Sequence, residues 1–440
     1  MSRTSIDMNP SVTSAIDTIF PVTSAQREIW LAQQLDPESS VYNIAQYVEI
    51  HGPVNEFRMQ QAVQRVVQEA QTLRASFIEV DGEIYQRIDP MSDWKLPVLD
   101  FSERDDPLTE AEEWMISEVR VPMHPNVSPL FSFALLKLQY DKYLLYQSAH
   151  HLVIDAVGIT LVTRRAAELY HDYVSNTGVS SPTFLPIRCI VDEDEAYRNS
   201  SRYLEDKDYW CGKVWDLSGF PKQTPGNSVG SGHEVLRRTD YLRLDETDFL
   251  RKLAKRHDVR YSNLTIAAAA ACMHCITGKS DIVVGMAVSA RNSEPLKTTP
   301  AMLSNIILLR VRIEPGVTFP ELLHCTADEI SKALQHQLFR GEEIAREMGT
   351  SARLWEVADI HVNFMGFDYG ILFNGNPVTV HNVSTGPTSG AVLAVYDHHG
   401  DEVGTRIDWA WRDGTEIASY KLVDRFIRVM KAVAADPQVL

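Results

Sequence analysis

The stretch SAHHLVIDAVGIT, Ser148–Thr160, places two adjacent histidines before an aspartate inside an apolar run. The residues before it, KYLLYQSAH (142–150), alternate in polarity and predict a strand, whereas DAVGITLVTRRAAELYHDYV (155–174) has the apolar spacing of a helix. Asp155 therefore falls at the expected helix N-cap. Because two neighbouring buried imidazoles cost free energy unless they form hydrogen bonds or do chemistry, this stretch is the first candidate for a functional site.

Two interpretations of this stretch stay open at the level of the residues. Asp155 can be a simple cap and the histidines ordinary buried rings bonded to backbone. Alternatively, an imidazole that titrates near neutral pH can accept a proton from, or orient, an attacking amine or hydroxyl. No cysteine lies near the motif, so direct attack by a bound nucleophile on an activated acyl group fits better than a covalent acyl-enzyme.

Composition narrows the class of protein. The 440 residues, 44% of them hydrophobic and 23% charged, indicate a globular protein large enough for two domains. A net charge of −17 argues against a nucleic-acid partner, and the Arg164–Arg165 doublet is interpreted as a solvated helix face. No window reaches the ~18 consecutive apolar residues of a membrane span, and the N-terminus lacks a hydrophobic signal core, so we expect a cytoplasmic protein.

No metal or nucleotide cofactor is expected. Cys272 and Cys275 flank His274 in the sequence C-M-H-C, but a second ligand pair at suitable spacing is missing, so this segment is interpreted as helix core. Glycine-rich phosphate loops are also missing, which argues against nucleotide hydrolysis and Rossmann cofactors.

Helices and strands alternate along the chain, so the expected fold class is α/β. Thr23 and Gln26 are spaced as a capping box for a first helix that Pro37 ends. Strand pairs are expected to turn at Asp81–Gly82 and at Tyr140–Asp141, with an acidic, irregular stretch over about 100–125.

The segment SNTGVSSPTFLP (175–186) has the composition of a linker between two packed units. We therefore expect a flexible tail over 1–18, an N-terminal lobe over 19–180 that carries the histidine motif, and a C-terminal lobe over 181–440.

The motif HHLVID (150–155) resembles the HHxxxD signature of condensation domains of nonribosomal peptide synthetases and of the wider chloramphenicol acetyltransferase-like acyltransferases. The likeness continues in the expected order over nearly the whole chain. The motifs that carry it are PVTSAQREIWLAQQLDP (21–37), LRASF (73–77), HHLVIDAVG (150–158), YSNLTIAAAAA (261–271), VSARNSEPLKTTPAMLSNIILLRV (288–311) and IHVNFMGFDY (360–369).

This resemblance implies an architecture and a reaction. It implies two acetyltransferase-like lobes in a V-shaped arrangement, with the active site at their junction and a tunnel opening on each face. A pantetheine- or coenzyme A-linked acyl thioester is the donor, and the amine of an aminoacyl group on a peptidyl carrier protein is the acceptor. No permanently bound cofactor is implied. An isolated unit is expected to be a monomer, and the C-terminal sequence RVMKAVAADPQVL (428–440) is expected to precede an adenylation domain.

The resemblance also implies roles for individual residues. His151 would be the catalytic histidine, acting as a base or positioning the amine, while His150 supports the loop. Asp155 would pair with Arg291 across the lobe junction. Ala156 and Ala301 stand where glycine is usual, and Gly158 is expected to restore some backbone freedom nearby. Candidates for the substrate channel are Met302, Asn305 and Asn363.

Within the family, the sequences QREIWLAQQLDPESSVYN (26–43) and IHVNFMGFDYGILF (360–373) look most like starter domains, which take a fatty acyl group from coenzyme A or an aryl acid from a separate carrier. No carrier domain precedes residue 19, so the donor is expected in trans. The alternatives are an ordinary peptidyl-donor domain, an epimerization domain and a non-catalytic docking domain. Epimerization domains typically carry a Val-Ser-Trp-Arg-like run where this chain has AVGITL, and docking domains typically lose the second histidine.

Overall fold

The structure is a computed structural model that describes residues 18–90, 93–182, 184–215, 235–347, 357–366, 370–386, 391–397, 404–412 and 416–435. The chain divides into two compact units, of which unit 1 comprises Met1–Asn199, Arg291–Leu303 and Gly370–Pro387. Unit 2 comprises Ser200–Ala290, Ser304–Tyr369 and Thr388–Leu440. The expected boundary at 180/181 thus falls inside unit 1, and two later segments return to that unit. The expected tail over 1–18 lies outside the described residues except for Thr18.

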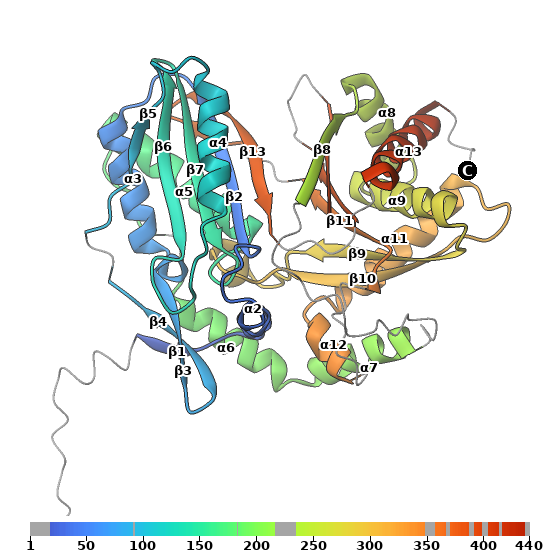
Figure 1. Ribbon diagram of the computed structural model, residues 1–440. Helices are drawn as coiled ribbons and strands as arrows, with labels where there is room; N and C mark the ends of the chain where they lie inside the picture. The colour runs from blue at the N-terminus through green and yellow to red at the C-terminus, as the bar shows by residue number, and fades with distance from the viewer. Residues whose placement is uncertain are drawn as a thin grey trace, which may run out of the picture. The chain divides into compact units, whose positions relative to one another are not determined.

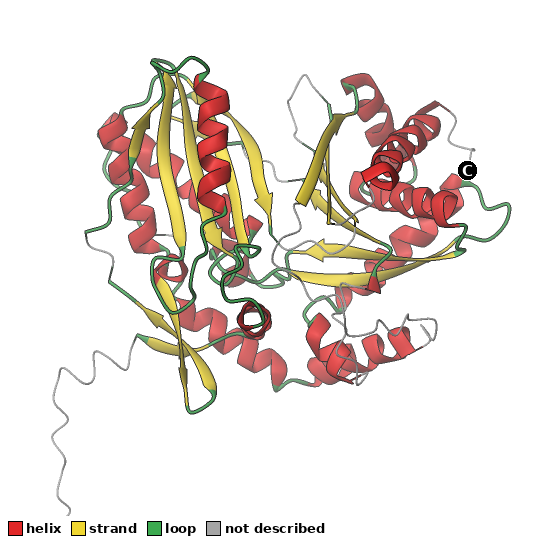
Figure 2. Ribbon diagram, viewed as in Figure 1, coloured by secondary structure: helices red, strands yellow, loops and turns green. Residues whose placement is uncertain are grey.

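Strands and helices alternate in both units, as Figure 2 shows, and the predicted α/β class is confirmed. Unit 1 is built on a six-stranded sheet in which most neighbours are antiparallel and only β5 and β6 pair in parallel. The predicted turn at Tyr140–Asp141 joins two of its central strands. In spatial order the strands are β12 (Leu372–Phe373), β13 (Asn376–Thr385), β2 (Asn43–His51), β7 (Lys142–His150), β6 (Phe131–Gln139) and β5 (Val98–Asp100).

One face of this sheet packs against helix α4 (Pro107–Val119), which lies in front of the strands in Figure 1. The prediction of an irregular stretch over 100–125 is therefore wrong. Asp106 caps the helix, Pro107 occupies its first turn, and only Ala111 and Met115 are buried along it. Because so few positions of this acidic helix are apolar and buried, its periodicity is weak in the sequence.

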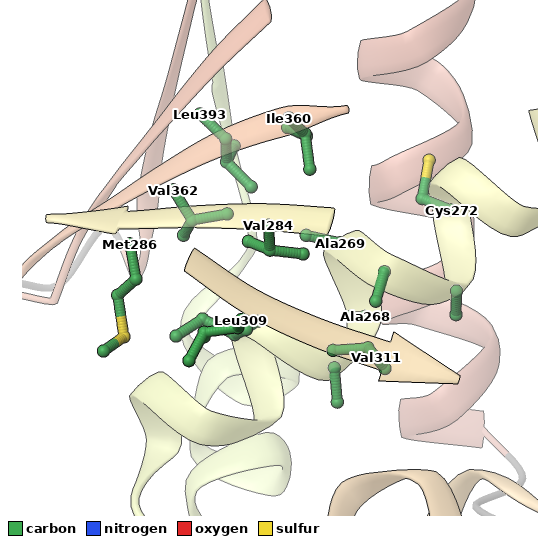
Figure 3. Close-up of a cluster of buried hydrophobic side chains, with 14 of the residues drawn as sticks. Ala268, Ala269, Cys272, Val284, Met286, Leu309, Val311, Ile360, Val362 and Leu393 are labelled. Carbon is green, nitrogen blue, oxygen red and sulfur yellow. The ribbon is translucent and has the colours of Figure 1, made fainter. Parts of the chain in front are cut away.

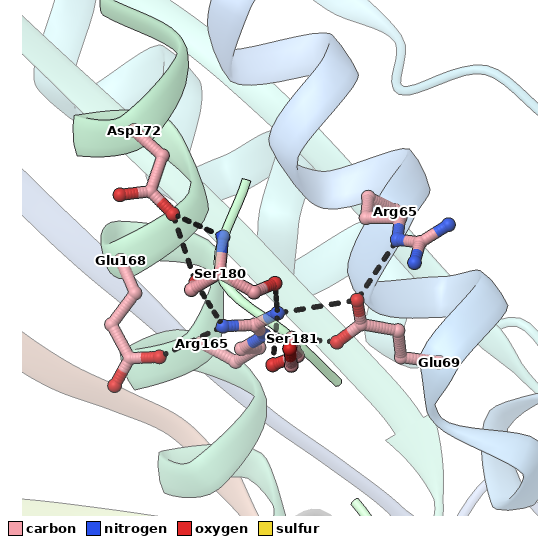
Figure 4. Close-up of polar contacts among 7 residues, drawn as sticks. All are labelled: Arg65, Glu69, Arg165, Glu168, Asp172, Ser180 and Ser181. Atoms are coloured by element: carbon pink, nitrogen blue, oxygen red, sulfur yellow. Dashed lines mark hydrogen bonds and ion pairs between the residues drawn. The ribbon is translucent and has the colours of Figure 1, made fainter. Parts of the chain in front are cut away.

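The other face of the sheet is covered by α3 (Glu56–Glu69) and α5 (Ala156–Ser175). Arg165 of α5 is buried, so its interpretation as part of a solvated face is wrong. Its guanidinium pairs with Glu69 of α3 and donates to the carbonyl oxygens of Ser180 and Ser181, which holds the segment after α5 against the helices (Figure 4). The predicted linker is therefore anchored at its centre.

Smaller elements complete unit 1. The predicted hairpin at Asp81–Gly82 is present, and both residues have a positive φ. Helix α2 begins after its N-cap Thr23, and the predicted capping box of Thr23 with Gln26 is confirmed. These elements are β1 (Ile19–Pro21), β4 (Glu83–Ile88) and β3 (Ala75–Val80) in a three-stranded sheet, with α2 (Ser24–Gln34), the 3-10 helix η1 (Gln71–Arg74), α6 (Ile187–Arg198) and α10 (Glu294–Thr298).

Unit 2 is built on the second six-stranded sheet, whose core side packs against α9, a helix buried along most of its length (Figure 3). Small alanine side chains on α9 allow this close packing against β9 and β11. The strands are, in spatial order, β10 (Asn305–Arg312), β9 (Asp281–Val288), β11 (Ile360–Met365), β14 (Ala391–Tyr396), β15 (Arg406–Arg412) and β8 (Val235–Tyr241). The helices are α7 (Ser201–Trp215), α8 (Leu244–Arg256), α9 (Tyr261–Thr277), α11 (Phe319–Gln335), α12 (Gly341–Glu347) and α13 (Glu416–Ala435).

Within the described part of the chain, none of the helices combines the length and the apolar character needed to cross a bilayer.

Candidate functional site

The histidine motif forms the turn between β7 and α5 in unit 1. The strand ends at His150, and the helix begins at Ala156 with Asp155 as its N-cap, as predicted. Asp155 has extended backbone angles, and its Oδ1 accepts a hydrogen bond of 2.8 Å from the backbone N–H of Gly158. Asp155 is therefore a helix cap, as the simpler of the two interpretations states.

Asp155 has a second task, because its carboxylate also forms a bidentate ion pair with Arg291. The guanidinium donates from Nη1 to Oδ2 over 2.7 Å and from Nη2 to Oδ1 over 2.8 Å, and the two side chains are 1% and 3% exposed. Burial raises the pKa of Asp155, but the charge of Arg291 and the hydrogen bonds from Arg291 and from backbone N–H groups outweigh it and hold that pKa below its usual range. The pair implied by the resemblance is present, but both partners belong to unit 1, so its predicted placement across the lobe junction is wrong.

The pair ties the segment 300–303 to the start of α5. The carbonyl oxygen of Ala301 accepts from Nη2 of Arg291 over 3.1 Å and from the backbone N–H of Asp155 over 3.2 Å. The N–H of Leu303 donates to Oδ2 of Asp155 over 3.0 Å. A Cβ on Gly158 would lie 3.1 Å from the nitrogen of Ala301 and only 2.5 Å from Cγ1 of Ile154. Glycine at 158 thus permits the close approach of this segment.

Alanine at 156 and 301 is accommodated without backbone strain. Among the described non-glycine residues, the positive φ angles fall at other positions, so neither alanine needs the conformational freedom of glycine.

His150 is fully buried and its ring is locked in one tautomer. Nε2 lies 3.3 Å from Oε1 of Gln33, an atom that can only accept, and Nδ1 accepts from the backbone N–H of Leu152 over 3.1 Å. The proton of the neutral ring therefore sits on Nε2. Burial, with a smaller contribution from His151, lowers the pKa of His150 to about 3. A ring that stays neutral with both nitrogens engaged supports the loop and cannot shuttle protons near pH 7.

His151 differs from its neighbour in its surroundings. Its backbone N–H donates to the carbonyl oxygen of Tyr42 over 2.7 Å, which fixes the main chain of the residue, while the residue itself is only half-buried. A half-buried imidazole near neutral pH can exchange a proton, or accept a hydrogen bond, with a group that reaches it. The geometry thus makes the two histidines unequal.

Two glutamines of α2 support this turn, a role that the sequence analysis assigned to neither of them. Gln33 uses its amide nitrogen to bind the carbonyl oxygens of the chain after α2, which leaves its oxygen for His150. Gln26 donates from Nε2 to the carbonyl oxygen of Leu152 over 3.3 Å and to Oε1 of Gln86 over 3.0 Å. The i, i+7 spacing of two buried glutamines was the signal that could have found them.

The structure gathers His150, His151, Asp155, Ala156, Gly158, Arg291 and Met302 in unit 1, whereas Asn305 and Asn363 belong to unit 2. Met302 is buried. Asn305 donates from Nδ2 to the carbonyl oxygens of Gln337 and Phe339, both over 2.9 Å, and so joins the start of β10 to the segment after α11. Asn363 is half-buried in β11, opposite Ala394 of β14. Channel roles for Met302, Asn305 and Asn363 stay predictions.

The segment around Cys272 has the features of helix core. The Cys272 side chain is buried with its sulfur 3.8 Å from the carbonyl oxygen of Leu422, and burial raises its pKa to about 12, whereas Cys275 is exposed. The described ranges contain no group of three or more histidine, cysteine, aspartate or glutamate side chains placed to hold a metal ion.

Comparison with known proteins identifies the family. A family model described as "Condensation domain" matches residues 16–368. The chain is 33% identical over 396 residues to the dimodular nonribosomal peptide synthase of Bacillus subtilis (strain 168), covering 89% of this chain and 16% of that protein. It is 34% identical over 389 residues to the isonitrile lipopeptide synthase of Streptomyces coeruleorubidus, covering 88% of this chain and 26% of that protein. The chain thus spans about a quarter or less of these relatives.

Solved structures agree with this match. A variant of the starter condensation domain of rhizomide synthetase RzmA, in complex with C8-CoA, has a TM-score of 0.85 and 31% identity over 98% of each chain. The first condensation domain of the calcium-dependent antibiotic synthetase, in complex with a substrate analogue, has a TM-score of 0.86 and 30% identity over 96% of this chain and 97% of that one. The predicted α/β fold with two acetyltransferase-like lobes is thereby confirmed. From its motifs, its site and these matches, the chain belongs to the condensation-domain family of nonribosomal peptide synthetases.

Proposed function

We propose that this chain is a starter condensation domain, an acyltransferase that joins an acyl thioester to the amine of an aminoacyl group on a peptidyl carrier protein. The amine nitrogen attacks the thioester carbonyl carbon, a C–N bond forms and the C–S bond breaks. The amine gives up one proton and the departing sulfur takes one up. The observation that carries the proposal is the inequality of the two motif histidines in a chain whose family forms amides.

In this proposal His151 is the catalytic histidine. His150 is neutral and engaged at both ring nitrogens, so the proton transfer or the orientation of the amine falls to His151. The pair of Asp155 and Arg291 acts at a distance from the chemistry, because its two opposite charges neutralise each other and it fixes the backbone on either side of the turn. These two residues are positioning residues.

The proposed donor is an acyl group on coenzyme A, delivered in trans. The support is the likeness to the RzmA starter domain, which was solved with C8-CoA, and to a lipopeptide synthase. We propose a peptidyl carrier protein as the source of the acceptor and an adenylation domain as a neighbour, because the relatives are far longer synthetases. A monomeric state of the isolated chain is a further expectation that light scattering can check.

The experiment incubates the chain with an aminoacyl-loaded carrier protein and one donor at a time, and intact-protein mass spectrometry reads the mass of the carrier. The donors are C8-CoA, an aryl group on a carrier and a peptidyl group on a carrier. We compare the natural chain with His151→Ala and with His257→Ala, a surface histidine of unit 2 that contacts His324. We expect His151→Ala to lose about 10²–10⁴-fold in rate and His257→Ala to keep the natural rate.

Each alternative gives a different result. Unchanged product formation by His151→Ala would refute the role of that residue. Acceptance of the peptidyl carrier donor alone would replace the starter assignment by an ordinary condensation domain. Deuterium incorporation at the α-carbon of the aminoacyl group in D₂O, without a donor, would indicate epimerization. Carrier binding without product from any donor would indicate a docking domain.

A further inference from the structure

Gly386, the residue that follows β13, lies beside the catalytic histidine proposed above. Strand β13 pairs with β2, and the register brings Thr385 opposite Ile44. Asn43, the residue before Ile44 in β2, pairs with His150 of β7, the strand on the other side of β2. A segment more than 200 residues after the histidine motif therefore reaches the same end of the unit 1 sheet.

The imidazole of His151 leaves little room for a side chain at Gly386, the residue after β13. A Cβ built on Gly386 would lie 3.2 Å from Cδ2 of His151 and 3.9 Å from Nε2, and it would also lie 3.2 Å from Cγ2 of Ile44. A methyl group at this position would thus be wedged between the imidazole and a buried isoleucine. The ring occupies room that exists because residue 386 has no side chain.

Two further features fix the backbone of Gly386. Its φ of +83° lies in the left-handed region that glycine adopts without the steric cost of a Cβ. The hydroxyl of Ser384 donates to the carbonyl oxygen of Asn43 over 2.8 Å and accepts from the N–H of Gly386 over 3.4 Å. These two hydrogen bonds of Ser384 hold Gly386 beside the first residue of β2. Tyr42, the residue before that strand, accepts the hydrogen bond from the main chain of His151.

We propose that Gly386, held by Ser384, is a positioning residue that sets the orientation of the His151 imidazole during amide formation. This inference rests on the proposed function, in which His151 handles the amine. The hydrogen bond from the His151 N–H to Tyr42 fixes the backbone of the residue, and residue 386 lies beside the Cδ2–Nε2 edge of its ring. The backbone at Gly386 limits the rotation of the His151 side chain on that edge of the ring.

The decisive comparison is Gly386→Ala against Gly375→Ala. Gly375 lies in the turn between β12 and β13 with a φ of +89°, and a Cβ there would meet no atom within 4 Å. Both variants impose nearly the same backbone strain on the same returning segment. Only Gly386→Ala adds a group against His151.

Two readouts are measured on the full chain. The first is kcat and KM for amide formation with the donor that the natural chain accepts, and the second is the NMR titration of His151 in protein labelled at histidine ring carbons, assigned with His151→Ala. We expect Gly386→Ala to lower kcat by up to about 10²-fold, the scale of a small misplacement of a reacting group, with KM nearly unchanged. Its His151 resonance and titration midpoint should move. Gly375→Ala should match the natural chain in both readouts.

A second variant keeps the test decisive if Gly386→Ala does not fold. Ser384→Ala adds no volume and removes the hydroxyl that holds Gly386, so we expect a smaller loss of kcat and a shift of the same His151 resonance. An unchanged kcat and an unchanged His151 titration in the folded variants would overturn the inference. The NMR readout separates the two proposals: an active His151→Ala refutes the proposed function, whereas an unmoved His151 signal refutes the positioning role alone.

Discussion

Replacing Arg291 by methionine tests the energetic role of the buried pair. The substitution keeps an unbranched apolar side chain of similar length and removes the guanidinium. The Asp155 carboxylate, 1% exposed, then keeps the backbone N–H groups of Gly158 and Leu303 as donors and loses both charged hydrogen bonds from Arg291. The Ala301 carbonyl oxygen also loses a donor.

The expected cost follows from leaving one charge buried without its partner. Breaking such a pair from one side costs about 3–5 kcal/mol of unfolding free energy. Asp155→Asn should cost a similar amount, because it leaves the Arg291 guanidinium buried. The double variant Asp155→Asn/Arg291→Met carries no buried charge and keeps a capping oxygen, so its loss should be clearly smaller than the sum of the two single losses.

The assay is urea unfolding, with hydrogen exchange of peptides from α5 to identify the transition of unit 1. Arg65→Met is the matched control, since it removes a guanidinium that is 40% exposed and that lies 2.9 Å from Glu69, a carboxylate that keeps Arg165. We expect the control to lose less than about 1 kcal/mol.

The stability lost in Arg291→Met should also depend on pH, in a direction that follows from the pKa of Asp155. In the natural chain the pKa of Asp155 is depressed, so its contribution is full above the unfolded pKa near about 3.9 and is lost as the pH falls through the lower folded value. Without Arg291, burial raises that pKa, and the carboxyl takes up a proton on folding. The deficit of Arg291→Met should therefore shrink as the pH falls from 7 to 4.5. A loss equal to that of Arg65→Met, or additive losses in the double variant, would refute this account.

Three further substitutions probe the frame of the site. His150 stays neutral in the fold because its pKa is lowered to about 3, whereas its unfolded pKa is about 6.5. Between these two values its contribution to the free energy of unfolding should rise with pH by about 1.4 kcal/mol per unit. His150→Gln should therefore lessen the slope of stability against pH in urea unfolding from pH 4 to 7. Arg165→Met should cost about 3 kcal/mol through buried Glu69 and speed hydrogen exchange in the segment after α5; slow exchange there would contradict the anchor. Gly158→Ala should cost about 1–3 kcal/mol by crowding, whereas Gly212→Ala, in open space on α7, should gain up to about 1 kcal/mol; equal thermal midpoints would contradict this.

Features with local causes could be predicted from the sequence. The capping box of Thr23 and Gln26, the turn at Asp81–Gly82 and the N-cap at Asp155 depend on contacts within four residues, so their residue types are visible in a short window. The interpretation of the segment around Cys272 and Cys275 as part of a helix is also confirmed, because both residues lie in α9. The ion pair of Asp155 and Arg291 came from the family resemblance, since no local rule joins residues so far apart.

Features with distant causes were missed. Strand β13 pairs with β2, as between Val378 and Ile50, and its alternation is broken by a bulge between Asn382 and Ser384. Because one inserted residue moves the following side chains to the other face, the period of two is lost from the sequence. Arg165 was assigned to solvent for a similar reason, since its partner Glu69 lies on another helix.

The site therefore divides into chemistry that the motif supplies and geometry that other segments supply. The main chain of His151 donates a hydrogen bond to Tyr42, and the ring of His151 lies beside Gly386. The ring of the neighbouring His150 is held by Gln33 of α2. The partners in these contacts, Tyr42, Gln33 and Gly386, all lie outside the six-residue motif. Since a misplacement of the reacting group by about 1 Å can cost 10²-fold in rate, substitutions in these supporting segments can reduce amide formation while every motif residue is retained.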